Sequence, residues 1–152
     1  MSSILIKDVK EIITMDDERR KLKGYDLFIK DNKIEKLSEN IESEYKNKAD
    51  EVIDGSDYFL YPGLINTHHH FYQTLTRNIA SVQNAELFDW LKSLYPIWAR
   101  LTPEAVYYST LLASAELLKT GCTTSSDQFY VFPESQPDNL IDEEFKAASE
   151  IG

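Results

Sequence analysis

Residues 58–65 form a near-continuous apolar run, Tyr-Phe-Leu-Tyr-Pro-Gly-Leu-Ile, and no other stretch constrains the fold as strongly. A strand with one face in solvent alternates apolar and polar residues, whereas a strand buried on both faces is apolar throughout. We therefore expect a buried strand of an α/β architecture. A hydrophobic fraction of 42% in 152 residues is sufficient for a packed core.

The chain before this run predicts a small antiparallel sheet. Asp31-Asn32 joins two apolar segments at the spacing of a tight hairpin, and residues 16–20 form a charged connection between two others. Residues 39–50 are polar and suit a short exposed helix or a loop. The expected strands are residues 4–6, 11–15, 24–30, 33–37 and 51–55.

Two helices are expected after the apolar run. Residues 85–101 carry apolar side chains at helical spacing, and Pro96 is expected to break or kink this helix near its end. Thr102 is a suitable N-cap for the second helix, Pro103 suits its first position, and Gly121 supplies its stop.

A second strand and a last helix complete the pattern. Residues 122–127 are rich in β-branched and small residues and predict a strand that ends on Asp127. Asp142 is expected to cap a helix that runs through residues 143–148. Two βα repeats cannot close a barrel, so we expect their apolar faces to require further chain or a partner as cover.

The three histidines of the chain are adjacent and follow the apolar run directly. In an extended segment, His68 and His70 project to one side and His69 to the other, where we expect a hydrogen-bonded structural role. Two imidazoles on one face suit zinc or another borderline divalent ion. A catalytic zinc usually takes three protein ligands and a water molecule, so His68 and His70 alone make an incomplete site.

Five further residues have both a functional and a structural interpretation, and the sequence leaves the choice open. Gln73 can offer a donor and an acceptor to a substrate, or it is a surface glutamine. Asp127 ends a strand and is either a catalytic carboxylate or a turn-capping one. Trp90, Trp98 and Tyr130 have aromatic faces for stacking on a flat ring, although such residues more often belong to the core.

The formal net charge of −10 disfavours nucleic acid as a partner, because phosphate binding requires clustered Lys and Arg. No apolar stretch approaches the roughly 20 residues that span a bilayer, and the first residues do not resemble a secretory signal. Cys122 is the single cysteine, which fits a reducing compartment. We expect a cytoplasmic protein that binds neither nucleic acid nor membrane.

The histidine segment resembles the amidohydrolase superfamily, in the branch that holds the cytosine, guanine and 8-oxoguanine deaminases and the triazine hydrolases. Residues 62–77 (PGLINTHHHFYQTLTR) are similar to the first-strand signature of 8-oxoguanine deaminase-like proteins. Residues 121–127 (GCTTSSD) are similar to the second-strand segment of that group. Shorter agreements at residues 87–91, 95–98 and 101–104 extend the resemblance over nearly the whole chain.

The resemblance implies the start of a metal-dependent hydrolase (β/α)8 barrel preceded by part of a small β-sandwich. Residues 1–58 would belong to the sandwich, and residues 59–152 would be the first βα units of a truncated TIM-like barrel. Relatives take further histidines, a glutamate and an aspartate from later strands. This chain would therefore be an N-terminal fragment with an incomplete metal site.

The resemblance also implies a hydrolase that acts on carbon–nitrogen bonds other than peptide bonds, through water activated by zinc or iron. His68 and His70 would be metal ligands, while Gln73 and Trp90 would lie beside a small heterocyclic substrate, namely a purine, pyrimidine or triazine-like ring. Because the general acid and base of relatives come from later strands, the isolated chain is expected to show negligible deaminase activity.

Two points stay open at this level. Relatives often carry histidines where this chain has Gln128 and Phe129, so the resemblance does not select the ring. The alternative function is a non-catalytic remnant or interaction module that pairs with a separate C-terminal half. A homo-oligomer or such a complementing half is the protein partner that these interpretations allow.

Overall fold

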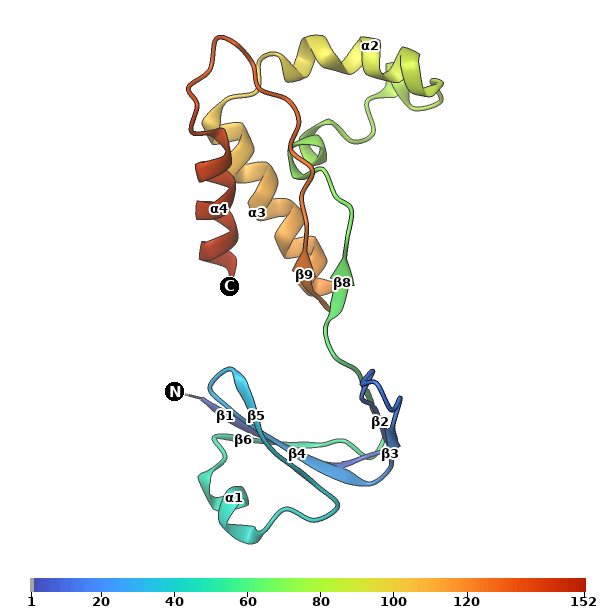
Figure 1. Ribbon diagram of the computed structural model, residues 1–152, viewed down its shortest axis with the longest axis vertical. Helices are drawn as coiled ribbons and strands as arrows, with labels where there is room; N and C mark the ends of the chain where they lie inside the picture. Colours follow the sequence, from blue (N-terminus) through green and yellow to red (C-terminus); the bar gives the residue numbers. More distant parts are fainter. Residues whose placement is uncertain (1) are drawn as a thin grey trace. The chain divides into compact units, whose positions relative to one another are not determined.

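The computed structural model describes residues 2–152, which divide into two units, one ending at Pro62 and the other beginning at Gly63 (Figure 1). Each unit holds its own sheets, and strands and helices together give a mixed α/β chain. The first unit contains a four-stranded sheet with the order β5-β4-β1-β6. Its strands are β1 (Ser3–Val9), β4 (Tyr25–Lys30), β5 (Lys33–Ser38) and β6 (Glu51–Asp54).

Strand pairing in this sheet is antiparallel except at one edge. β4 and β5 form the expected hairpin around Asp31-Asn32, where Asp31 adopts a φ of 56°. β6 pairs in parallel with β1, so the expectation of an antiparallel sheet is wrong for this strand. The connection explains the difference, because a long crossover that includes helix α1 (Ser43–Lys48) separates β5 from β6.

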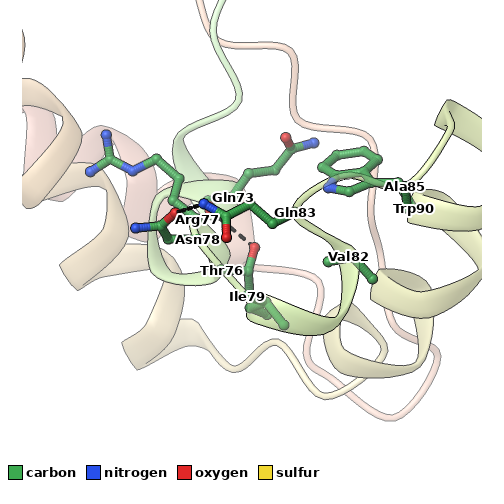
Figure 2. A pocket seen from close by; sticks show the side chains of 9 residues that line it. All are labelled: Gln73, Thr76, Arg77, Asn78, Ile79, Val82, Gln83, Ala85 and Trp90. Carbon is green, nitrogen blue, oxygen red and sulfur yellow. Dashed lines mark hydrogen bonds between the residues drawn. The ribbon is translucent and has the colours of Figure 1, made fainter.

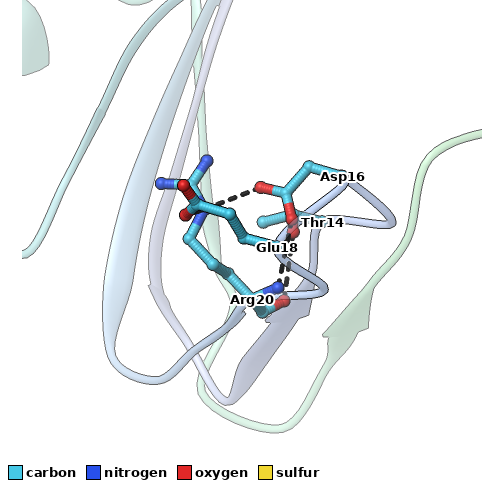
Figure 3. A network of polar contacts seen from close by, with 4 residues as sticks. All are labelled: Thr14, Asp16, Glu18 and Arg20. Carbon is cyan, nitrogen blue, oxygen red and sulfur yellow. Dashed lines mark hydrogen bonds and ion pairs between the residues drawn. The ribbon is translucent and has the colours of Figure 1, made fainter.

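A three-stranded sheet with the order β3-β2-β7 completes the first unit. It consists of β2 (Glu11–Ile13), β3 (Lys21–Leu22) and β7 (Phe59–Leu60), of which the sequence does not predict β3. Arg20 holds the loop before β3: its backbone N–H donates to Asp16 Oδ1 at 3.1 Å and its Nε to Asp16 Oδ2 at 2.6 Å (Figure 3). The backbone N–H of Arg20, above all, lowers the pKa of Asp16 from its usual value.

The apolar run at residues 58–65 is not one buried strand. Pro62-Gly63 divides it into β7 and a separate strand, β8 (Leu64–Asn66). Leu64 is 58% exposed and Ile65 is 69% exposed, so the expectation of burial on both faces is wrong within the part of the chain that the structure describes. Proline lacks the N–H that continues a ladder of hydrogen bonds, which explains the division.

The second unit is built on a parallel pair of strands. β8 pairs with β9 (Cys122–Ser125), as the strand–helices–strand pattern predicts. The register shifts after Leu64, which leaves Thr123 as an extra residue on β9. The two backbones approach closely here, because a Cβ added to Gly63 would lie 1.9 Å from Thr123 Oγ1. Glycine at position 63 is therefore required for the strand that leads into the histidines.

Two 3₁₀ helices and two α-helices connect β8 to β9. They are η1 (Phe71–Thr76), η2 (Ala80–Val82), α2 (Leu87–Trp98) and α3 (Pro103–Lys119). α3 begins as predicted, since Thr102 Oγ1 accepts the Ala105 N–H at 3.2 Å. Pro96 does not break α2, which continues to Trp98. Among the described helices the longest, α3, has 17 residues, and none has the length and apolarity of a bilayer-spanning segment.

Helix α4 (Leu140–Ile151) begins three residues earlier than expected, because Asn139 rather than Asp142 occupies the N-cap position. α3 and α4 lie side by side (Figure 1). On α3 the fully buried positions include the small side chains of Ser109 and Ala113. Small side chains at a helix contact permit the close packing seen in protein interiors.

The core of the second unit lies between η1, α2 and α3. Trp98 Nε1 donates to Thr76 Oγ1 at 3.1 Å, and the Tyr72 ring packs edge-on against the Trp98 ring with centroids 5.3 Å apart. The buried members of this core are Tyr72, Val82, Leu94, Trp98, Leu101, Val106, Val131 and Leu140. Because η1 follows the histidines directly, its burial in this core fixes the chain on one side of them.

Glu144 on α4 makes the stability of this unit depend on pH. Burial, with a smaller contribution from the Asp127 charge, raises the pKa of Glu144 from 4.5 to about 7. Between these two values the folded chain holds a proton that the unfolded chain releases, so the free energy of unfolding falls as pH rises. Glu144→Gln removes this loss of stability, because the glutamine side chain does not titrate. We expect the variant to melt a few degrees higher than the wild type at about pH 8 and equally at about pH 4.

Thermal denaturation followed by circular dichroism across this pH range measures the effect. Glu143→Gln is the matched control, because it removes a carboxylate from the neighbouring position of the same helix, where Glu143 pairs with Lys146 at 3.2 Å. A difference in Tm between Glu144→Gln and the wild type that stays the same at every pH would contradict the prediction.

Candidate metal centre

His68 and His70 bring their Nε2 atoms to 3.2 Å from each other. Their rings are edge to face, with centroids 4.9 Å apart and an interplanar angle of 89°. Both residues follow the end of β8 at Asn66, so they lie in irregular backbone rather than in the strand itself. Asn66 ties the segment to β8, because its Oδ1 accepts the backbone N–H of His68 at 3.1 Å.

The separation of the two nitrogens suits a shared metal ion. Two imidazole nitrogens at about 2.0–2.1 Å from one tetrahedral zinc lie roughly 3.3–3.4 Å apart. The pair at 3.2 Å therefore requires almost no movement to hold such an ion. Within residues 2–152, no group of three or more His, Cys, Asp or Glu side chains is arranged to bind a metal. His68 and His70 thus offer two ligands, and their metal role stays a prediction.

The backbone carbonyl of Gln128 sets the tautomer of His70. It lies 2.8 Å from His70 Nδ1, so that Nδ1 carries the proton and donates it. The lone pair of His70 then resides on Nε2, which faces His68. A metal-binding histidine usually donates its other ring N–H to a carbonyl or carboxylate in this way. No side-chain pattern in the sequence marks Gln128 for this role, because the group that acts is main chain.

His69 points away from this pair and packs on the Phe71 ring, with centroids 4.8 Å apart. Its Nδ1 is buried and has no hydrogen-bond partner among the described residues, in contrast to the expected hydrogen-bonded role. Burial lowers the pKa of His69, which favours the neutral imidazole.

Asp127 follows the end of β9 and contacts the histidine segment. Its Oδ1 accepts the backbone N–H of Phe71 at 2.6 Å. Its Oδ2 is buried and, within residues 2–152, has no hydrogen-bond partner. Burial raises the pKa of Asp127. The structure therefore places Asp127 beside the candidate ligands, whereas a catalytic role for it stays a prediction.

Gln73 is held by two tyrosine hydroxyls that the sequence does not connect with it. Its Nε2 donates to Tyr72 Oη at 3.1 Å and to Tyr130 Oη at 3.0 Å. The Tyr130 ring also packs edge-on against the His70 ring, with centroids 5.2 Å apart. Burial raises the pKa of Tyr72, so its hydroxyl stays protonated. One side chain, Tyr130, thus links Gln73 to the candidate metal ligands.

A cavity of about 290 Å³ adjoins Gln73, and Trp90 lines it as well (Figure 2). The structure therefore brings together the two residues that the sequence suggests for substrate binding. Trp90 also packs edge-on against Trp98, with centroids 5.3 Å apart, so one side of its ring belongs to the core. Two amides of the cavity, Gln83 and Asn78, are joined by a 2.8 Å hydrogen bond, and the sequence gives no signal for either.

Arg77 at the cavity wall is already paired, because its guanidinium contacts Glu116 Oε1 at 2.8 Å. The lining of the cavity is otherwise neutral, with amide, hydroxyl, aliphatic and aromatic side chains. Such a lining suits a neutral polar ring better than an anion, because hydrogen-bonding groups rather than free charges face the space.

Known proteins share much of the sequence of this chain. The amidohydrolase family pattern matches residues 59–151. Over 99 residues, 65% of this chain and 22% of the relative, the sequence is 54% identical to an 8-oxoguanine deaminase of Pseudomonas aeruginosa. It is 32% identical to a hydroxydechloroatrazine ethylaminohydrolase of Pseudomonas sp. strain ADP, across 100% of this chain and 33% of that protein.

A solved structure extends the agreement to three dimensions. An atrazine chlorohydrolase from Arthrobacter aurescens, complexed with zinc, superposes with a TM-score of 0.87 at 29% identity, over 98% of this chain and 34% of that one. The chain thus spans about a third or less of the length of these relatives, which are deaminases and hydrolases. The non-catalytic alternative is not favoured. The chain belongs to the amidohydrolase family.

Proposed function

We propose that this chain supplies two metal ligands and part of the substrate pocket of a metal-dependent aminohydrolase that acts on a purine, pyrimidine or triazine-like ring. The observation that carries the proposal is the pair of Nε2 atoms, from His68 and His70, that face each other at 3.2 Å. They follow the carboxyl end of a parallel strand pair, where α/β enzymes collect their ligands. When bound there, zinc or iron would supply a Lewis acid that lowers the pKa of water.

The fold assignment that accompanies this function is also a proposal. β8 and β9 would be the first two strands of a (β/α)8 barrel, within residues 59–152. The sheets of residues 1–58 would form part of a small β-sandwich. A catalytic zinc site takes a third protein ligand, so further barrel strands, in the same polypeptide or in a complementing half, would complete the donor set. A cytoplasmic location and the possibility of a homo-oligomer remain predictions.

Gln73 and Trp90 supply the substrate side of the proposal. Both N–H groups of the Gln73 amide are engaged by the hydroxyls of Tyr72 and Tyr130, which leaves Oε1 as a free acceptor. A ring that presents an N–H to this oxygen is therefore preferred. Trp90 offers an aromatic face at the same cavity, whose volume of about 290 Å³ is at the small end for ligand sites and suits one ring system.

Ammonia release tests the proposed function. The 152-residue chain, loaded with zinc or iron, is expected to release no measurable ammonia from 8-oxoguanine, 5-methylthioadenosine or an amino-triazine, because the acid–base groups are lacking. The same residues joined to the remaining barrel strands should hydrolyse at least one of these rings. No turnover by the joined protein on any ring, with metal bound, would contradict the proposal.

Tyr130→Phe tests how Gln73 is held. The variant keeps the ring that packs on His70 but removes one hydroxyl that fixes the Gln73 amide. In the joined protein we expect KM to rise about tenfold with kcat within about twofold, because loss of the hydrogen bond from Gln73 to Tyr130 leaves the Gln73 amide free to turn away from the ring that it binds. Steady-state kinetics measure the effect. Tyr108→Phe, on the exposed side of α3, is the control, and its KM and kcat should match those of the wild type. An unchanged KM for Tyr130→Phe would contradict the prediction.

A further inference from the structure

Asp127 and Gln128 together make three contacts to the consecutive residues 69–71, and we call this pair the Asp127–Gln128 bracket. The Gln128 N–H donates to the carbonyl oxygen of His69 at 2.8 Å. The Gln128 carbonyl accepts from His70 Nδ1, also at 2.8 Å. Asp127 Oδ1 accepts the Phe71 N–H at 2.6 Å. The bracket therefore contacts His70 itself and the residue on each side of it.

We propose that Asp127 is a positioning residue that holds His70 in its ligand geometry through the backbone of Phe71. This inference rests on the proposed metal role of His68 and His70. Asp127 is not assigned a contact with metal or substrate. Its carboxylate instead fixes the main chain that immediately follows the ligand.

The start of η1 shows why this contact matters. His70 occupies the N-cap position of η1, yet in the described chain its side chain makes no capping hydrogen bond. The Phe71 N–H is therefore one of the donors that a helix start leaves unpaired, and Phe71 is buried, with only 6% of its surface exposed. Asp127 supplies the missing acceptor from a residue 56 positions away. Removal of this acceptor leaves a donor without a partner beside His70.

Three variants distinguish a positioning role of Asp127 from an effect of its charge and from a general loss of stability. Asp127→Ala removes both oxygens. Asp127→Asn keeps Oδ1 as the acceptor for the Phe71 N–H and removes only the charge. Gln128→Ala is the matched control, because the bracket uses only the main chain of Gln128, whose side chain is exposed. All three are made in the 152-residue chain, and thermal melting verifies that each is folded.

Two measurements on these chains test the inference. The first is titration with Co²⁺, followed by its visible absorption. Asp127→Ala should weaken binding by about 10–100-fold, the usual effect of losing an outer partner of a metal ligand, while Asp127→Asn and Gln128→Ala should stay within about threefold of the wild type. The second is hydrogen exchange of the Phe71 amide without metal, which should quicken at least about tenfold in Asp127→Ala and stay slow in Asp127→Asn.

The two measurements distinguish a failure of the proposed metal role from a failure of the proposed positioning role. If the wild-type chain gives no Co²⁺ spectrum, the metal role of the histidines is wrong, and Phe71 exchange still decides whether Asp127 holds the segment. If wild-type Co²⁺ binding is present and Asp127→Ala equals it, the positioning role is overturned. If Asp127→Ala does not fold, the wild-type chain decides: slow exchange of the Phe71 amide supports the bracket, and exchange as fast as that of an unprotected amide overturns it.

Discussion

Replacement of both His68 and His70 by alanine is expected to abolish divalent-metal binding by the chain. The two Nε2 atoms lie 3.2 Å apart and form the only preorganised nitrogen pair among the chain's three histidines, all of which the structure describes. Loss of an outer partner alone typically costs 10–100-fold in metal affinity, so loss of a ligand should cost at least about 100-fold in each single variant. Isothermal titration with Zn²⁺, or the Co²⁺ spectrum, measures the change.

His69→Gln is the control for this prediction. Its ring lies on the other side of the segment, against Phe71, so the affinity should stay within about threefold of the wild type. Wild-type binding is expected to be far weaker than nanomolar, because two nitrogens fall short of a complete zinc site. Stoichiometric zinc at nanomolar strength in the wild-type chain, or equal loss in His69→Gln, would show that the ligands are assigned wrongly.

Gly63→Ala is expected to destabilise the second unit by about 3 kcal/mol or more, the upper range for forcing an extra methyl group into a packed site. The added Cβ would lie 1.9 Å from Thr123 Oγ1, 2.5 Å from its Cγ2 and 2.7 Å from its Cβ. Rotation of the Thr123 side chain cannot relieve a contact with its own Cβ. β8 and β9 must therefore separate, and the histidines lose the strand that orients them.

Urea denaturation measures this change, with the Co²⁺ spectrum as a second measurement. The double variant Gly63→Ala/Thr123→Gly removes the three atoms nearest to the new methyl group, so it should recover most of the lost stability relative to Thr123→Gly alone. Equal denaturation midpoints for Gly63→Ala and the wild type would refute the close approach. Failure of the double variant to recover would assign the damage to another cause.

Local signals in the sequence are sufficient for several elements of this fold. The cap at Thr102 with proline at the next position places the start of α3 correctly, because capping involves residues only three apart. The Asp31-Asn32 turn predicts the β4–β5 hairpin for the same reason. Pairing between strands that are distant in the sequence is harder to predict. The parallel pairing of β6 and the short strand β3 both depend on where distant segments meet, and the sequence predicts neither.

In the candidate site, too, local features can be predicted from the sequence and long-range contacts cannot. Alternation along an extended chain correctly predicts that His68 and His70 project together and that His69 does not. The groups that orient them come from far along the chain, since Asp127 binds the Phe71 N–H and a carbonyl at Gln128 binds His70. A main-chain carbonyl belongs to every residue type, so no sequence pattern can mark it. The exposure of Leu64 and Ile65 agrees with the expectation that two βα repeats leave apolar faces uncovered, although it contradicts burial of this strand on both faces.

The main-chain character of the Gln128 contacts has a consequence for how this family can diversify. The backbone N–H and C=O of residue 128, which form hydrogen bonds with His69 and His70, are present whatever side chain stands at that position. This chain carries an exposed glutamine there. Substitutions at this position can therefore change the neighbouring surface and leave the main-chain contacts to His69 and His70 in place. If the proposed metal role holds, the surface beside the ligands and the geometry of the ligands can evolve independently.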